Sequence, residues 1–192
     1  MVARVWKVED NGEIKIEKVK NFTEILMNSK FNIDKANLVA TGGFSSIITV
    51  WDCESDSCKE VATFDHSSFD QDFNGLEIEW QNNKNVAVAG RSKYIYLWSI
   101  DQPKSPIQTW QGHEEVVEQI QWDSRGQFLA SCSNDKYVCI WSPDNSQPKI
   151  TLNGCGSAVH TIKWSHAGDQ AGADPLLAAG TQDGFILIWN VE

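Results

Sequence analysis

Residues 111–141 contain three short runs of apolar and other strand-forming residues, and turn-forming residues separate the runs. The runs are EVVEQIQW (115–122), QFLASCS (127–133) and KYVCIW (136–141). Runs of this length and composition are typical of β-strands, and the Asp, Ser, Asn and Gly residues between the runs tolerate turn geometry. Three strands in about 30 residues cannot cover both faces of their own sheet, so the pattern predicts a unit that packs against further copies.

The same pattern recurs along the chain, and tryptophans mark it most clearly. The tryptophans that end the third run of each copy lie 43 to 48 residues apart and are Trp6, Trp51, Trp98, Trp141 and Trp189. The residues that end the first run are Trp80, Trp122 and Trp164, with Phe31 in the weakest copy. A repeat of this length, built from short strands, predicts the blades of a β-propeller. The remaining tryptophan, Trp110, falls where an outermost strand is expected to end.

We therefore predict an all-β fold, a partial propeller that spans residues 1–192 as one domain. Residues 1–7 and 13–20 form the last two strands of an incomplete blade, joined by an Asn11-Gly12 hairpin turn. Three complete four-stranded blades follow, and a last blade, residues 157–189, lacks an outermost strand. Propellers usually close with about four to eight blades. We expect a fragment whose ring is completed by missing blades or by a second copy, and a compact monomer in light scattering would exclude the second copy.

The formal net charge of −10 disfavours nonspecific binding to nucleic acid or to an anionic membrane. The charge suits either plain solubility or a basic partner such as a Lys/Arg-rich tail. The N-terminus has no apolar signal core, and no apolar run approaches membrane-spanning length. We expect an intracellular protein, nuclear or cytoplasmic, with the polar loop 165–175 exposed.

The five cysteines include no CxxC pair. Cys132 and Cys139 fall inside predicted strands, where a free thiol behaves as a small apolar group. Cys53 and Cys58 flank a turn, without the two further ligands that a metal would need. We expect a reducing compartment, no metal site and no cofactor.

One copy of the repeat contains the pair Gly112-His113 together with Ser131, Asp135 and Trp141, and in these residues the chain resembles the WD40 family. The resemblance implies hydrogen bonds from the Trp indole to the Ser hydroxyl, from the hydroxyl to the His and from the His to the Asp. Ser, His and Asp also suggest a catalytic triad, but the Trp occupies the hydroxyl and no oxyanion site accompanies it, which favours the structural interpretation. The other copies keep parts of the set. The first copy has Thr41, Ser45 and Trp51, and the second has His66, Ser92 and Trp98, with Val88 at the Ser position. The last copy has Asp183 and Trp189, with Cys155 and Ala179 at the His and Ser positions.

More narrowly, residues 107–142 and 160–191 resemble the C-terminal propeller of the transducin-β-like corepressor subunits. The shared features include the IKWS segment followed by a long polar insertion, and the likeness is best over residues 64–191. This resemblance implies a nuclear corepressor or histone-tail-binding complex. The N-terminal oligomerisation segment of that family has no counterpart in these residues, so the resemblance does not support tetramerisation.

The WD40 likeness also indicates a binding face, formed by the loops that lead into the innermost strands and by the turns between second and third strands. The turn candidates are Phe44, Arg91, Asn134 and Gln182. The inner-strand candidates are Met27, Leu76, Glu118 and His160. Aromatic and Arg side chains dominate binding hot spots, which favours Phe44 and Arg91. Glu118 is expected to pair with a Lys or Arg of a bound tail.

The predicted function is a non-catalytic scaffold that binds protein partners or peptide segments, without direct contact to nucleic acid or membrane. A cytoplasmic assembly scaffold of another WD40 subfamily is the alternative. A propeller hydrolase is a remote alternative, because the sequence has no GxSxG, P-loop or HExxH motif. His160 and His166 stand six positions apart, which is a poor spacing for metal ligands.

Overall fold

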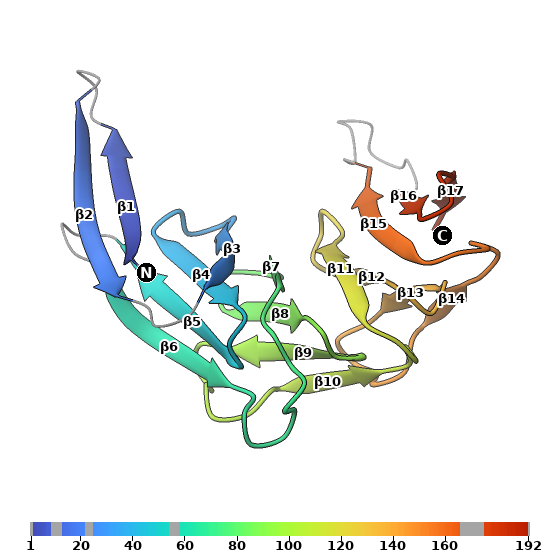
Figure 1. The fold of residues 1–192 in the computed structure, drawn as a ribbon, viewed down its shortest axis with the longest axis horizontal. Helices are drawn as coiled ribbons and strands as arrows, with labels where there is room; N and C mark the ends of the chain where they lie inside the picture. Colours follow the sequence, from blue (N-terminus) through green and yellow to red (C-terminus); the bar gives the residue numbers. More distant parts are fainter. Residues whose placement is uncertain (1, 9–12, 22–24, 54–57, 166–174, 192) are drawn as a thin grey trace.

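A computed structural model describes residues 2–8, 13–21, 25–53, 58–165 and 175–191. The regular structure in these residues consists of β-strands, which form five antiparallel sheets. The sheets follow one another along an open arc, with the N-terminus on one limb and the C-terminus on the other (Figure 1). The Asn11-Gly12 turn and nearly all of loop 165–175 lie outside the described residues.

The strands divide among the sheets in chain order. The first sheet contains β1 (Val2–Val8) and β2 (Ile14–Asn21). The second contains β3 (Leu26–Phe31), β4 (Leu38–Gly43), β5 (Ile47–Asp52) and β6 (Lys59–Asp65). The third contains β7 (Glu77–Trp80), β8 (Asn85–Ala89), β9 (Tyr94–Ser99) and β10 (Gln108–Gln111). The fourth contains β11 (Val117–Trp122), β12 (Leu129–Ser133), β13 (Val138–Trp141) and β14 (Ile150–Leu152), and the fifth contains β15 (Val159–Trp164), β16 (Leu176–Thr181) and β17 (Ile186–Asn190).

Each sheet is a meander in which neighbouring strands are consecutive in the chain. The first strands β3, β7, β11 and β15 line the concave side of the arc, whereas β6 and β10 lie on its convex side (Figure 1). This is the arrangement of propeller blades around an axis. The predicted fold class is confirmed, with three complete four-stranded blades between two incomplete ones.

The hydrophobic core lies between consecutive blades, and β8 shows why. Val86 and Val88 pack into the cluster shared with the β3–β6 sheet, while Ala87 and Ala89 pack into the cluster shared with the β11–β14 sheet. All four side chains are fully buried. Because successive residues of a strand point to opposite faces, a blade between two neighbours needs apolar residues at every position.

The β15–β17 sheet differs because one of its faces is open. Ile186 and Ile188 on β17 are 77% and 65% exposed, whereas Val138 and Ile140 at the matching positions of β13 are buried. Leu187 and Trp189, which alternate with these residues, pack toward the β11–β14 sheet. This last blade is therefore stabilised by apolar contacts on one face.

Side chains of the innermost strands also connect neighbouring blades by hydrogen bonds. Gln119 on β11 accepts the backbone N–H of Ile162 on β15 at 2.8 Å. Glu77 on β7 holds the equivalent position one blade earlier and accepts a hydrogen bond from the Ile120 N–H. An innermost strand has a strand neighbour on one side alone, so these side chains satisfy N–H groups that face the adjoining blade.

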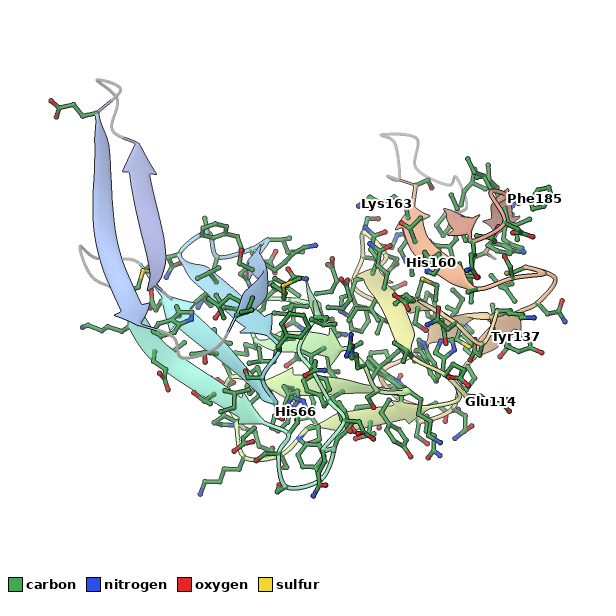
Figure 2. The ribbon with its side chains drawn as sticks, viewed as in Figure 1. His66, Glu114, Tyr137, His160, Lys163 and Phe185 are labelled. Carbon is green, nitrogen blue, oxygen red and sulfur yellow. A yellow bond between two sulfur atoms is a disulfide. The ribbon has the colours of Figure 1, made fainter. Side chains whose placement is uncertain are left out.

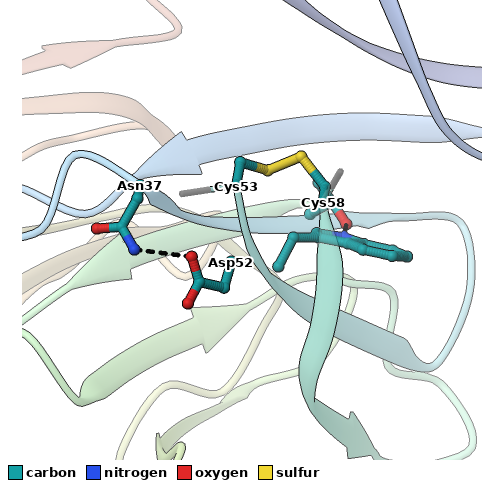
Figure 3. The surroundings of a disulfide bond; sticks show 6 residues. Asn37, Asp52, Cys53 and Cys58 are labelled. Atoms are coloured by element: carbon teal, nitrogen blue, oxygen red, sulfur yellow. Dashed lines mark hydrogen bonds between the residues drawn. A yellow bond between two sulfur atoms is a disulfide. The ribbon is translucent and has the colours of Figure 1, made fainter. Parts of the chain in front are cut away.

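Cys53 and Cys58 form a disulfide, with their Cα atoms 4.1 Å apart (Figure 3). The register of β5 with β6 pairs Asp52 with Lys59, so the next residue beyond each of them is a cysteine that faces the other across the hairpin. Asn37 donates a hydrogen bond to Asp52 beside this link at 2.7 Å. The disulfide differs from the expectation of free thiols in a reducing compartment. The two thiols are brought together by the register of β5 with β6, which their spacing in the sequence does not reveal.

The remaining cysteines, Cys132, Cys139 and Cys155, are free and buried. Burial raises the pKa of all three thiols, so they are neutral side chains at physiological pH. No three or more His, Cys, Asp or Glu side chains in the described residues are grouped so that they could hold a metal ion. The described part of the chain also contains no helix that is long and apolar enough to cross a membrane.

Candidate functional site

The WD40-like residues of the β11–β14 blade form a continuous hydrogen-bonded chain. Trp141 on β13 donates its indole N–H to Ser131 Oγ on β12 at 2.7 Å. Ser131 Oγ lies 2.7 Å from His113 Nε2, and His113 Nδ1 lies 2.7 Å from Asp135 Oδ2. Since the Ser131 oxygen accepts the indole N–H, its own proton is directed to Nε2, which assigns the His113 proton to Nδ1.

The Asp135 carboxylate joins the β12–β13 turn to the loop before β11. It accepts the backbone N–H of Glu114 at 3.0 Å and that of Tyr137 at 2.9 Å. Burial acts to raise the pKa of Asp135, but the hydrogen bond from His113 and those from the two N–H groups outweigh burial, and the net pKa is lowered. The carboxylate therefore stays ionised at neutral pH and keeps both segments in place.

This arrangement resembles a catalytic triad in composition but not in geometry. Ser131 is fully buried, and its hydroxyl is already engaged by Trp141 and His113. A catalytic serine needs a hydroxyl that substrate can reach and donors placed for an oxyanion. The hydrogen bonds among these four residues therefore stabilise the blade.

The β7–β10 blade keeps two members of the set and joins them directly. Val88 occupies the Ser position, and the Trp98 indole donates to His66 Nε2 at 3.0 Å. His66 Nδ1 lies 3.1 Å from the Ser46 carbonyl oxygen, and the His66 ring stacks on that of Phe73 with centroids 3.8 Å apart. Burial lowers the pKa of His66 to about 4, so the imidazole is neutral and donates Nδ1–H to the carbonyl.

The other two blades replace the missing histidine in different ways. In the β3–β6 blade, Trp51 donates to Thr41 Oγ1 at 2.9 Å, and the Thr41 hydroxyl donates to the Thr49 carbonyl at 3.3 Å. In the β15–β17 blade, Ser157 donates its hydroxyl to Asp183 at 2.6 Å. A hydroxyl thus ties the turn of the last blade to the loop before β15.

A second recurring contact aligns the predicted binding residues. We use "leading loop" for the loop before an innermost strand and "loop face" for the end of the blades that carries these loops and the turns between second and third strands.

In three blades, the turn candidate donates its backbone N–H to a leading-loop carbonyl two residues before the inner-strand candidate. These pairs are Phe44 to Ile25 (3.2 Å), Asn134 to Val116 (3.1 Å) and Gln182 to Ala158 (2.8 Å).

The fourth turn candidate, Arg91, sits beside the same kind of junction. The preceding Gly90 packs so closely on the Asn74 carbonyl that a Cβ atom would clash with it. The leading loop of this blade also contacts the turn of the blade before, since His66 N–H donates to the Ser46 carbonyl at 2.9 Å. The eight predicted residues therefore occur as four turn and inner-strand pairs along one continuous face.

The side chains of the loop face differ in exposure. Phe44 and Met27 are large apolar groups that are 45% and 56% exposed. Arg91, Gln182 and His160 are exposed, whereas Leu76, Glu118 and Asn134 are half-buried. His160 lies on β15, in the limb of the arc that carries the C-terminus (Figure 2).

Glu118 is held in a defined position at the inner rim of the loop face. The Asn134 amide donates to Glu118 Oε1 at 2.7 Å. Among the described residues, no hydrogen bond reaches the second carboxylate oxygen, Oε2. A carboxylate anchored by one oxygen presents the other in a fixed direction, which suits recognition of a donor.

Sequence reasoning missed two exposed apolar residues on the loop face, Ile25 and Phe69. Ile25 is 49% exposed beside Phe44, and Phe69 is 47% exposed in the leading loop of the β7–β10 blade. Phe69 packs edge-on against Tyr96, with ring centroids 5.4 Å apart. The available signal was an aromatic residue inside an otherwise polar loop, SSFDQDF.

Acidic residues outnumber basic ones on the loop face. Within the described leading loops, turns and inner-strand candidates, the acidic residues are Asp70, Asp72, Glu114, Glu115, Glu118, Asp135 and Asp183. The basic residues of the same segments are Arg91, Lys93 and Lys136. The net formal charge of these segments is negative, and the loop face therefore favours positively charged ligands over anions.

The arc of meander sheets and the repeated Trp-centred hydrogen bonds define a β-propeller built from sequence repeats. Residues 104–142 and 146–190 match the family model of the WD domain, G-beta repeat. These segments, 84 of the 192 residues, are similar to WD40 repeats, and the match supports the WD40-repeat family for the chain.

Curated proteins similar to this chain include a WD40 repeat-containing protein, a translation initiation factor subunit and a SEC13 homolog. The chain is 29% identical over 120 residues to the WD40 repeat-containing protein HOS15 of Arabidopsis thaliana, covering 61% of this chain and 19% of that protein. It is 37% identical over 81 residues to eukaryotic translation initiation factor 3 subunit I of Aspergillus terreus, covering 42% and 22%. It is 32% identical over 81 residues to the SEC13 homolog of Dictyostelium discoideum, covering 41% and 26%. The matched region thus spans about a quarter or less of these relatives.

A solved structure shares the fold over nearly the whole chain. A chain in the crystal structure of the Mitotic Checkpoint Complex superimposes with a TM-score of 0.78 at 24% sequence identity. The superposition covers 98% of this chain and 55% of that chain. At this identity the likeness establishes the fold alone.

Proposed function

We propose that this chain is a non-catalytic scaffold that binds a peptide segment of a protein partner on its loop face. The observation that carries this proposal is the alignment of turn and inner-strand candidates along one face. The alignment places exposed Phe44 and Met27 near one end and the anchored Glu118 carboxylate further along. Apolar anchors near a fixed charged group are the elements that concentrate binding energy in protein interfaces.

The proposed partner segment is basic. The loop face carries more acidic than basic residues, and the whole chain has a formal net charge of −10. Such a field attracts a positively charged segment and accelerates its association. Together with the resemblance to the transducin-β-like propellers, these charges support a nuclear corepressor context in which the segment is a histone tail.

A cytoplasmic assembly scaffold is the second candidate. It is supported by the names of two relatives, a translation initiation factor subunit and a SEC13 homolog. In that case the partner is a subunit of a larger assembly, and a basic tail has no special preference. Binding of a histone-tail peptide therefore discriminates between the two contexts.

The direct test is fluorescence anisotropy with a labelled basic histone-tail peptide at moderate salt. Glu118→Gln and Phe44→Ala are each expected to weaken binding about tenfold, corresponding to ~1.4 kcal/mol. Glu79→Gln and Ile33→Ala are matched controls, because both residues line a small hollow of about 180 Å³ at the far ends of the innermost strands. These controls are expected to bind as the unsubstituted protein does.

Absence of binding, or equal losses in the Glu118 and Glu79 variants, would count against the basic segment and the loop face. Binding that requires Phe44 but is indifferent to Glu118 would favour the assembly scaffold. A salt titration adds a second criterion, because attraction between exposed charges weakens as ionic strength rises.

A further inference from the structure

We propose that Asn153 is a site of spontaneous deamidation on the loop face, with the Gly154 backbone nitrogen as the nucleophile. Asn153 and Gly154 form an Asn-Gly pair in the leading loop just beyond β14, and both residues are exposed. Gly154 has a φ of +87°, and a Cβ atom placed on it would meet nothing within 4 Å. Among the described backbone contacts outside the strands, none involves the Gly154 N–H.

The reaction needs water and no other reagent. The Gly154 nitrogen attacks the side-chain carbonyl carbon of Asn153, and the new C–N bond closes a five-membered succinimide. The bond from that carbon to Nδ2 breaks, and ammonia leaves with the proton that Gly154 has lost. Water then adds to either succinimide carbonyl, so the ring opens to aspartate or to isoaspartate at position 153, without any change in oxidation state.

Glycine at the following position favours this attack because it has no Cβ to obstruct the approaching carbonyl carbon, and its backbone rotates freely. The attack also requires the amide nitrogen to turn away from any hydrogen bond or packing that holds it. Exposed loop residues meet this requirement, whereas residues held in the packed interior do not. The local fold thus decides which Asn-Gly pair reacts.

The chain contains an internal control, the pair Asn74-Gly75. Gly75 is buried, and its N–H donates to the Ser45 carbonyl at 3.3 Å. A Cβ on Gly75 would lie 2.0 Å from the Ile48 side chain, which shows how tightly this backbone is enclosed. The Asn-Gly pair at position 153 is therefore free to react, whereas packing and a hydrogen bond restrain the pair at position 74.

Deamidation at position 153 adds a negative charge to the loop face. The modified loop continues to Ser157, whose hydroxyl donates to Asp183 at 2.6 Å, and from there into β15 and His160. The isoaspartate product also lengthens the main chain by one methylene group within this loop. Both changes occur on the segment that connects the β15–β17 blade to the blade before it.

The experiment is incubation of the 192-residue chain at mildly alkaline pH, followed by proteolysis and mass spectrometry of the peptides. The exchange of the amide NH₂ for OH is detected by mass, and the two products separate by chromatography. In the folded protein, Asn153 is expected to react more than about tenfold faster than Asn74, because a local opening that costs ~1.4 kcal/mol already slows the held site tenfold. In concentrated urea the two rates are expected to converge.

Two variants make the outcome specific. Asn153→Gln is expected to suppress the reaction at this position, because attack would have to close a larger ring, and it keeps the amide and the fold. Ile48→Ala is expected to loosen the packing on Gly75 and to accelerate the reaction at Asn74 while leaving Asn153 unchanged. An Asn153 site that reacts no faster than Asn74 in the folded protein would overturn the proposal, as would a large rate difference that persists in urea.

Discussion

Replacing Glu77 with glutamine tests the hydrogen bonds that join neighbouring blades. Glu77 presents a carboxyl group to the Ile120 N–H at the seam between β7 and β11. One blade later, the amide of Gln119 performs the same task toward Ile162 at 2.8 Å and accepts the Thr161 hydroxyl at 2.9 Å. An amide therefore fits this position, and Glu77→Gln exchanges the charge without removing the acceptor.

The magnitude follows from the titration of Glu77. Burial, opposed by the charge of Lys30 and assisted by those of Glu79 and Glu118, raises its pKa from 4.5 to about 7. Between these pH values the folded state keeps a proton that the unfolded state has lost, so the free energy of unfolding falls as pH rises through this window and levels off above it. Each pKa unit corresponds to at most ~1.4 kcal/mol, and partial solvent exposure reduces this, so we expect a total loss of about 1–3 kcal/mol.

Urea unfolding at a series of pH values measures this loss. Ionisation of Glu77 is expected to lower the stability of the unsubstituted protein between about pH 5 and about pH 7, on top of a rise from His66 that both proteins share, so that Glu77→Gln lacks the decline and is the more stable protein above pH 7. Glu79→Gln is the matched control, because Glu79 forms its ion pair with Lys30 and should leave most of the decline in place. If Glu77→Gln kept the full pH dependence, or were less stable at alkaline pH, the reasoning would be refuted.

The remaining predictions concern stability and thiol reactivity. Asp135→Ala removes the partner of a histidine and of two backbone N–H groups and should lower the free energy of unfolding by about 2 kcal/mol in urea melts, whereas Asp183→Ala, on an exposed turn, should leave the midpoint nearly unchanged. A loss of only a few tenths of a kcal/mol for Asp135→Ala would contradict the role assigned to it. Cys53→Ser opens a short disulfide loop and should lower stability by about 2 kcal/mol without reductant; an unchanged midpoint would mean that the link is not formed. Cys132 and Cys139, with buried thiols of raised pKa, should react with iodoacetamide in urea but not in the folded protein, as mass spectrometry would show, and rapid labelling of the native state would contradict their burial.

The number and order of the blades could be predicted because large side chains mark the packing positions. Trp98 and Trp141 are almost completely buried at equivalent places, where a bulky residue must match the neighbouring blade. The direct bond from Trp98 to His66 could not be predicted, because it depends on the geometry left by Val88 on an adjacent strand. The Cys53–Cys58 pairing likewise depends on the register of two strands, which neither strand specifies alone.

Some of the binding residues could likewise be predicted from the sequence, and others could not. Phe44 and Asn134 were chosen by their offset from the turn Asp position, and the structure places them at equivalent turns of the loop face. Phe69 was missed because it lies in an irregular loop with no counterpart in the other repeats. Its exposure depends on how that loop folds over Tyr96, a contact that no periodic pattern marks.

In the 192-residue chain, the open face of the β15–β17 sheet affects how readily the backbone amide hydrogens exchange. The sheets from β3 to β17 each pack on their immediate neighbours, so local opening passes from one of these sheets to the next. The β7–β10 sheet must separate from two partners to open, whereas the β15–β17 sheet separates from one, with Ile186 and Ile188 already in water. Amides of β17 therefore exchange through a local event of low free-energy cost, while those of β8 report the unfolding of the whole arc.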